Sequence, residues 1–70
     1  MEYVIIDYCE KRTVIIDGDP DGDTGDLLLV EKGTHTFKLD GSQDYAPKWR
    51  RTVVKNTTSI SPMEVSFEKA

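Results

Sequence analysis

The stretch from Val14 to Leu39 decides the fold of this 70-residue chain. It reads Val14-Ile15-Ile16-Asp17-Gly18, then Gly22-Asp23-Thr24-Gly25, and then, after Leu28 and Val30, Gly33-Thr34-His35-Thr36-Phe37. Apolar side chains recur at every second position within its short runs, and turn-forming residues separate the runs. This alternation predicts three strands joined by tight turns, which build one wall of a small β-sandwich and leave little room for a reaction centre.

Strand signals continue on both sides of this stretch, and no run sustains a helical period. The expected strands are Tyr3–Tyr8, Arg12–Asp17, Leu27–Glu31, Thr34–Asp40, Trp49–Lys55 and Met63–Glu68, with room for a very short one within Asp17–Asp26. The link Cys9–Lys11 forms either a hairpin or a crossing between sheets, and Cys9 is expected to be half-buried. We therefore expect one all-β domain, residues 1–70, folded as a small antiparallel β-sandwich of about seven short strands.

The alternation also names the residues that should fill the core. A chain of this size has a single modest core. Its expected members are Val4, Ile6, Val14, Ile16, Leu28, Val30, Phe37, Leu39, Val53, Val65 and Phe67.

The composition excludes several classes of site. Thirteen acidic against nine basic residues give a net charge of −4, which argues against a nucleic-acid partner. One cysteine and one histidine exclude an internal disulfide and a zinc site of thiolates and imidazoles. The start of the chain has no signal-peptide pattern, and no apolar run is long enough for membrane insertion. As written the chain is expected in the cytoplasm, or at the cell envelope if it is a module of a larger protein.

The middle of the chain resembles the PEGA domain family, which consists of small prealbumin-like β-sandwich modules. Its pattern of V-x-I-D-G-x-x-x-G-x-T-P, alternating aliphatics and G-x-H-x-hydrophobic is met at Val14, Ile16, Asp17, Gly18, Gly22, Thr24, Leu28, Val30, Gly33, His35, Phe37 and Leu39. Gly25 stands in place of the proline, and Asp21 in place of a small apolar residue. The resemblance covers about a third of the chain. It implies a non-enzymatic accessory module of bacterial envelope or signalling proteins.

Two residues of this pattern have a direct physical reading. Asp17-Gly18 suits a hairpin turn in which the glycine has a positive φ and the Asp side chain accepts a local backbone N–H. His35 is expected to be half-buried, with a ring nitrogen bonded to a backbone carbonyl or to Thr24.

The acidic turn itself allows a second interpretation. Alternating carboxylates around a glycine form the first half of a calcium-binding loop, but the late bidentate glutamate is missing, because Leu28 stands in its place. The turn is therefore either a solvated acidic segment or a weak calcium site. The candidate ligands are Asp17, Asp19, Asp21, Asp23 and Asp26.

Two surface features are candidates for partner binding. Trp49, in a basic run beside Tyr45, is either a core or rim residue or an exposed platform for a sugar or a protein. Leu27 and Leu29 face away from the core if Leu28 and Val30 face into it, and together with Ile15 they would form an apolar patch for another domain or a second copy in a weak homodimer.

The expected function is therefore a non-catalytic interaction or structural module that binds a protein or an envelope component. The alternative is a carbohydrate-binding module, steadied by calcium at the acidic turn. No catalytic residue is expected, since no sequence context activates Cys9 or pairs two carboxylates in an apolar pocket.

Overall fold

The computed structural model describes all residues, 1–70, and the fold is all-β, as the sequence predicts. Nine strands follow one another along the chain, and no helix is present. They are β1 (Glu2–Asp7), β2 (Thr13–Ile16), β3 (Asp19–Asp23), β4 (Leu27–Val30), β5 (Gly33–Leu39), β6 (Tyr45–Ala46), β7 (Arg50–Val54), β8 (Met63–Ser66) and β9 (Glu68–Lys69).

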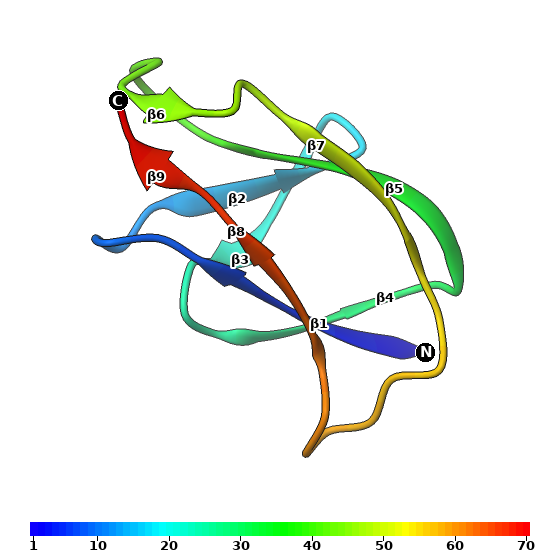
Figure 1. The fold of residues 1–70 in the computed structure, drawn as a ribbon. Coiled ribbons are helices and arrows are strands. Elements are labelled where there is room, and N and C mark those ends of the chain that lie inside the picture. The colour runs from blue at the N-terminus through cyan, green and yellow to red at the C-terminus, as the bar shows by residue number, and fades with distance from the viewer.

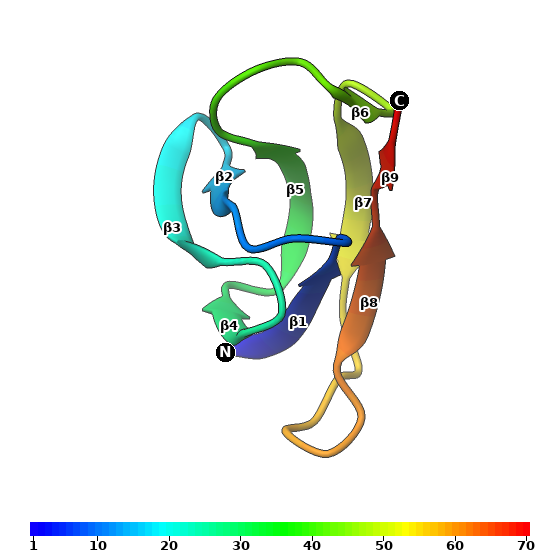
Figure 2. The same cartoon turned by 90° about the vertical axis from the view of Figure 1, so that its left-hand side faces the viewer.

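Two main sheets face each other across the core (Figures 1 and 2). One has the strand order β4-β1-β8 and the other β3-β2-β5-β7, while β6 and β9 form a small third sheet at one end. The link after β1 carries the chain from the first sheet to the second, so it is a crossing and not a hairpin, and Cys9 within it is exposed. The expectation of a wholly antiparallel fold is wrong in one place, because β1 and β8 run parallel.

The core contains the predicted residues, except that Val54 takes the place predicted for Val53. Val54 is fully buried, whereas Val53 is 48% exposed. The register explains this: Val54 pairs with Gly33 on the face of β5 that Phe37 shares, and Val53 pairs with Thr34 on the other face. Tyr45 also joins the core, where its ring packs edge-on against Phe67.

The Asp17–Gly18 turn connects β2 and β3 as predicted. The two residues have φ values of 52° and 89°, which are the positive values that a two-residue type I′ hairpin requires. The Asp17 carboxylate does not bond locally, however. It accepts the N–H of Thr36 on β5 at 2.9 Å, which ties the turn to the next strand of the sheet.

Candidate interaction surfaces

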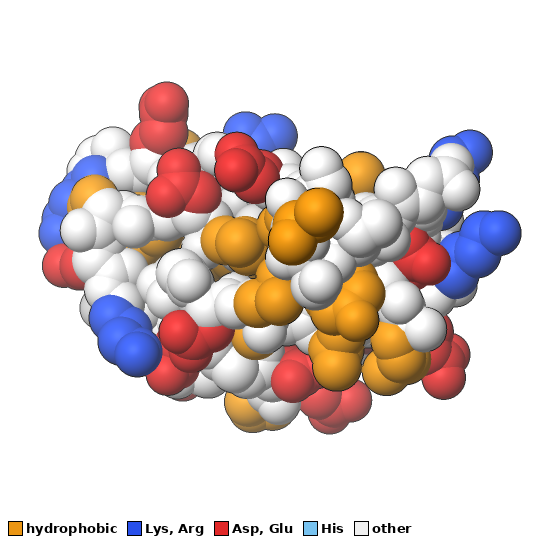
Figure 3. Space-filling model, turned by 90° about the horizontal axis from the view of Figure 1, so that it is seen from below, with side chains coloured by type: hydrophobic (Ala, Val, Ile, Leu, Met, Phe, Trp, Pro, Cys, Tyr) orange, Lys and Arg blue, Asp and Glu red, His pale blue; other side chains and the backbone are white.

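The outer face of the β4-β1-β8 sheet carries four apolar side chains in two adjacent cross-strand pairs. Tyr3 pairs with Leu29, and Ile5 pairs with Leu27. Leu27 and Leu29 are 44% and 49% exposed, and their partners Tyr3 and Ile5 are half-buried. Figure 3 shows hydrophobic side chains gathered over this side of the molecule, with acidic groups around them. We call Tyr3, Ile5, Leu27 and Leu29 the apolar face.

The prediction that Ile15 belongs to this apolar patch is wrong. Ile15 was expected beside the two leucines, but it lies on β2 in the other sheet and is only 7% exposed. Tyr3 and Ile5 take its place. Their outward direction follows from the burial of Val4 and Ile6, so the alternation of β1 contains the signal, but the pairing of β1 with β4 is long-range and is not visible locally.

The chain beyond β7 is fastened to the same sheet. Glu2 Oε1 accepts both the backbone N–H and the hydroxyl of Thr57, at 2.9 and 2.7 Å, and Tyr3 N–H donates to the Thr57 hydroxyl at 2.7 Å. The bonds from the Thr57 backbone and side chain lower the pKa of the Glu2 carboxyl. The connection between β7 and β8 is thereby held against β1, below which it extends in Figures 1 and 2. Ile60 within it is 93% exposed.

The outer face of the other sheet is mostly polar, and its exposed apolar side chains are Val53 on β7 and Trp49 at its rim. Trp49 directly precedes β7 and is 54% exposed, which answers the open question of its burial. A shallow open depression lies beside it, and we call its lining the Trp49 shelf: Asp17, Gly18, Thr36, Lys38, Trp49 and Arg51. Tyr45, predicted to share an exposed platform with Trp49, is instead 4% exposed, and its hydroxyl donates to the Leu39 carbonyl at 2.8 Å.

An ion pair fixes one end of the Trp49 shelf. His35 Nδ1 lies 2.6 Å from Asp17 Oδ2, and His35 Nε2 lies 2.6 Å from the Glu31 carbonyl oxygen. The carbonyl partner confirms half of the prediction for His35. The Thr24 alternative is wrong, since the Thr24 hydroxyl accepts the N–H of Arg12 and donates to the Glu10 carbonyl.

Both oxygens facing the His35 ring are acceptors, so the imidazolium form alone satisfies them both. Burial of the ring lowers the pKa of His35, but the bonds to Asp17 and to the Glu31 carbonyl outweigh it, and the net pKa is raised. The pKa of Asp17 is lowered, first by the Thr36 N–H and then by His35.

The five predicted calcium ligands are not brought together. Asp19, Asp21 and Asp23 lie along the extended strand β3, where residues two apart are separated by about 6.6 Å of backbone, so the strand spreads their carboxylates out and does not curl them around one point. Asp23 pairs with Lys11 at 3.9 Å, and Asp17 is held by Thr36 and His35. No group of three His, Cys, Asp or Glu side chains is placed to hold a metal ion.

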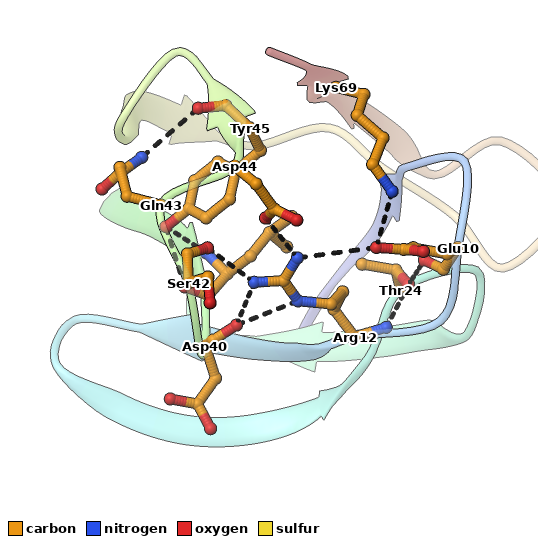
Figure 4. Close-up of polar contacts among 10 residues, drawn as sticks. Glu10, Arg12, Thr24, Asp40, Ser42, Gln43, Asp44, Tyr45 and Lys69 are labelled. Atoms are coloured by element: carbon orange, nitrogen blue, oxygen red, sulfur yellow. Dashed lines mark hydrogen bonds and ion pairs between the residues drawn. The ribbon is translucent and has the colours of Figure 1, made fainter.

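Arg12 forms the largest polar cluster, which sequence reasoning missed (Figure 4). Its guanidinium donates to the carbonyls of Asp40 and Ser42 and to the Asp44 carboxylate, with N–O distances of 2.7–3.0 Å. The Arg12 bond lowers the pKa of Asp44 and raises that of Arg12 itself. A side chain at Gly41, where φ is +90°, would come within 3.1 Å of Arg12 Nη2. The acceptors are 28–32 residues away in sequence, so no local pattern announces them.

Comparison with known proteins adds no relative. No protein-family model, no curated protein and no solved structure matches the chain. The PEGA resemblance therefore remains a prediction from the pattern between Val14 and Leu39. The structure contains no helix with the length and apolar character needed to span a membrane.

Proposed function

We propose that this protein is a non-catalytic interaction module that docks onto a protein or an envelope component through the apolar face. The observation that carries this proposal is the exposure of two adjacent apolar cross-strand pairs, Tyr3–Leu29 and Ile5–Leu27, on the outside of a sheet. A contiguous apolar patch on a small domain is typical of an interaction site, whereas isolated surface leucines are not.

The two sheets provide an internal contrast. The outward positions of β5 and β7 are mostly polar, with Thr34, Thr36, Lys38 and Arg51 around a single exposed valine, Val53, as expected for a face turned largely to water. The β4-β1 pair presents Tyr, Ile and two Leu in equivalent positions. Since both sheets bury their inner faces in one core, folding does not account for the difference.

Polar groups border the apolar face. Glu64 on β8 lies beside Ile5 in the sheet, and Glu31 follows directly after β4. An apolar centre with a charged rim is the usual anatomy of a protein-binding surface. It suits a partner whose own apolar patch has basic residues at its edge. Self-association through this face would bring together two rims that each contain Glu31 and Glu64, so we expect it to be weak.

Site-specific photo-crosslinking tests the proposal. A photoreactive amino acid is placed at Leu29, and a matched variant carries it at Val53, which is equally exposed, at 48%, but lies on the other sheet. After irradiation in the cell of origin, we expect a discrete adduct from position 29 that is absent from position 53. It should disappear when Leu27→Glu is added.

Two results would overturn the proposal. One is the same diffuse set of adducts from both positions. The other is a position-29 adduct that persists undiminished in the Leu27→Glu background, because a partner seated on the apolar face cannot be indifferent to a buried charge.

A further inference from the structure

The Trp49 shelf combines an exposed indole with two cations, Lys38 and Arg51, that make no ion pair in the protein. The ion pairs of the molecule are made by Lys11, Arg12, His35 and Lys69, so neither Lys38 nor Arg51 has a carboxylate within bonding distance. Six of the nine Lys and Arg side chains make no ion pair, and what distinguishes Lys38 and Arg51 is that they lie together beside the exposed indole.

The strand register brings these groups into one plane. Thr36 on β5 is opposite Arg51 on β7, and one step further along the same face Lys38 reaches the level of Trp49. The Arg51 guanidinium lies 5.7 Å from the centre of the indole ring, and its Nε donates to the Thr36 hydroxyl at 3.2 Å. That bond orients the guanidinium beside the indole and leaves its terminal N–H groups free.

The shelf also offers hydrogen-bond acceptors. The Asp17 carboxylate, half exposed, is held in place by the Thr36 N–H and by His35, and each of its oxygens can accept a further bond. A ligand for this shelf should therefore present a flat C–H surface for the indole, an anionic group for Arg51 and Lys38, and hydroxyl donors for Asp17.

We propose that the Trp49 shelf is a second binding site, separate from the apolar face, and that its ligand is a carboxylated oligosaccharide. A sugar ring stacks on the indole, its carboxylate pairs with Arg51 and Lys38, and its hydroxyls bond to Asp17 and Thr36. A peptide of acidic residues meets the cations equally well but carries no hydroxyl groups, whereas the sugar ring places hydroxyls beside its carboxylate, where Asp17 can accept their hydrogen bonds. The Trp49 shelf and the apolar face lie on different sheets, so a test of ligand binding at the shelf does not depend on whether the apolar face binds a partner.

Fluorescence titration tests this directly, because Trp49 is the only tryptophan in the chain. Three probes are compared at low salt: an oligogalacturonate, its methyl ester, which keeps the rings but loses the charge, and an oligo-glutamate of equal charge. We expect a saturable change with the oligogalacturonate, and binding weaker by about tenfold or more for each of the other two, the loss expected for one charged hydrogen bond.

Variants locate the site. Arg51→Gln should weaken oligogalacturonate binding by about tenfold, whereas Lys55→Gln, which makes the same change in net charge at an exposed position off the shelf, should not. The proposal is overturned if no probe gives a saturable change. It is also overturned if the ester binds as well as the acid, if the oligo-glutamate binds as well as the sugar, or if both variants weaken binding equally.

Discussion

Arg12 and Arg51 each lie beside an aromatic ring, but they differ in how many hydrogen bonds they make within the protein. The Arg12 side chain is 15% exposed, its guanidinium lies over the rings of Tyr8 and Tyr45, and every one of its nitrogens has a protein acceptor. Arg51 is exposed, lies beside Trp49, and makes a single hydrogen bond, to Thr36. Arg12 has four of its five N–H donors engaged by the protein, whereas Arg51 has only one engaged.

The difference suggests separate roles for the two arginines: Arg12 stabilises the fold, and Arg51 is available to the proposed ligand. Arg12 joins the loop Asp40–Asp44 to the link after β1, so it closes the end of the sandwich where β6 and β9 lie (Figure 4). A group satisfied in this way contributes to folding and is unavailable to a partner. Arg51 keeps most of its N–H groups free, and Leu27 and Leu29 keep nearly half of their surface exposed, so we expect these groups to contribute less to the fold than Arg12 does.

The largest effect should come from Arg12→Gln. The substitution leaves the Asp44 carboxylate without its cation and two loop carbonyls without donors. We expect a fall in melting temperature of about 10 °C or more, whereas Arg51→Gln should change it by no more than about 3 °C. Thermal unfolding followed by circular dichroism measures both. Equal losses in the two variants would remove the distinction between them.

The two tyrosines beside Arg12 sharpen the same comparison. The Tyr45 hydroxyl bonds to the Leu39 backbone, and Tyr45→Phe should cost about 1 kcal/mol of unfolding free energy. The Tyr8 hydroxyl is buried and has no hydrogen-bond partner, and burial is the main reason that its pKa is raised. Tyr8→Phe removes an unsatisfied group, so the melting temperature should stay the same or rise. Chemical denaturation distinguishes the pair, and a loss in Tyr8→Phe matching that in Tyr45→Phe would contradict this assignment.

A pH dependence should arise from the His35–Asp17 pair. The pKa of His35 is raised above its ordinary value of 6.5, so its contribution is complete below that pH and is lost as the pH rises through the folded-state pKa. The pKa of Asp17 is lowered from 3.8, so its contribution is present above that pH and is lost as the pH falls through its folded-state value. The pair therefore stabilises the fold most between these two ordinary values.

The histidine limb can be isolated with His35→Gln. Between pH 6 and pH 8.5 the melting temperature of the unsubstituted protein should fall by a few degrees relative to that of the variant, about the effect of one charged hydrogen bond at a partly exposed site. Parallel melting curves across this range would show that His35 does not titrate against Asp17.

Much of the fold can be predicted from the sequence, because the alternation of apolar and polar residues within each strand is a local signal. The seven longer strands, the Asp17–Gly18 hairpin and ten of the eleven predicted core residues follow from which side chains recur at alternate positions, whereas the two-residue strands β6 and β9 and the core position of Tyr45 do not. Val53 was misassigned because Val53 and Val54 are both β-branched and only the pairing of β7 with β5 decides which faces inward. The parallel pairing of β1 with β8 joins the two ends of the chain, and no neighbouring residue signals it.

The sequence predicts only some of the residues of the two candidate sites. The sequence identifies Leu27 and Leu29 as surface candidates because Leu28 and Val30 take the core positions, and Trp49 because it lies in a basic run. It wrongly places Ile15 and Tyr45 at the surface, whereas both are buried, and it does not identify Tyr3, Ile5, Lys38 and Arg51 as neighbours of the surface candidates. Cross-strand neighbours on an outer face depend on register between strands, which alternation within one strand does not contain.

The central claim is that the apolar face is held out for a partner and contributes little to folding. The double variant Leu27→Thr/Leu29→Thr tests it most directly, since threonine keeps the strand propensity and removes the apolar contact. Its unfolding free energy, measured with denaturant, should lie within about 1 kcal/mol of the unsubstituted protein, the cost of weakened cross-strand pairs. A loss of more than about 3 kcal/mol, as when a buried leucine is truncated, would show that these leucines belong to the core and would contradict the account.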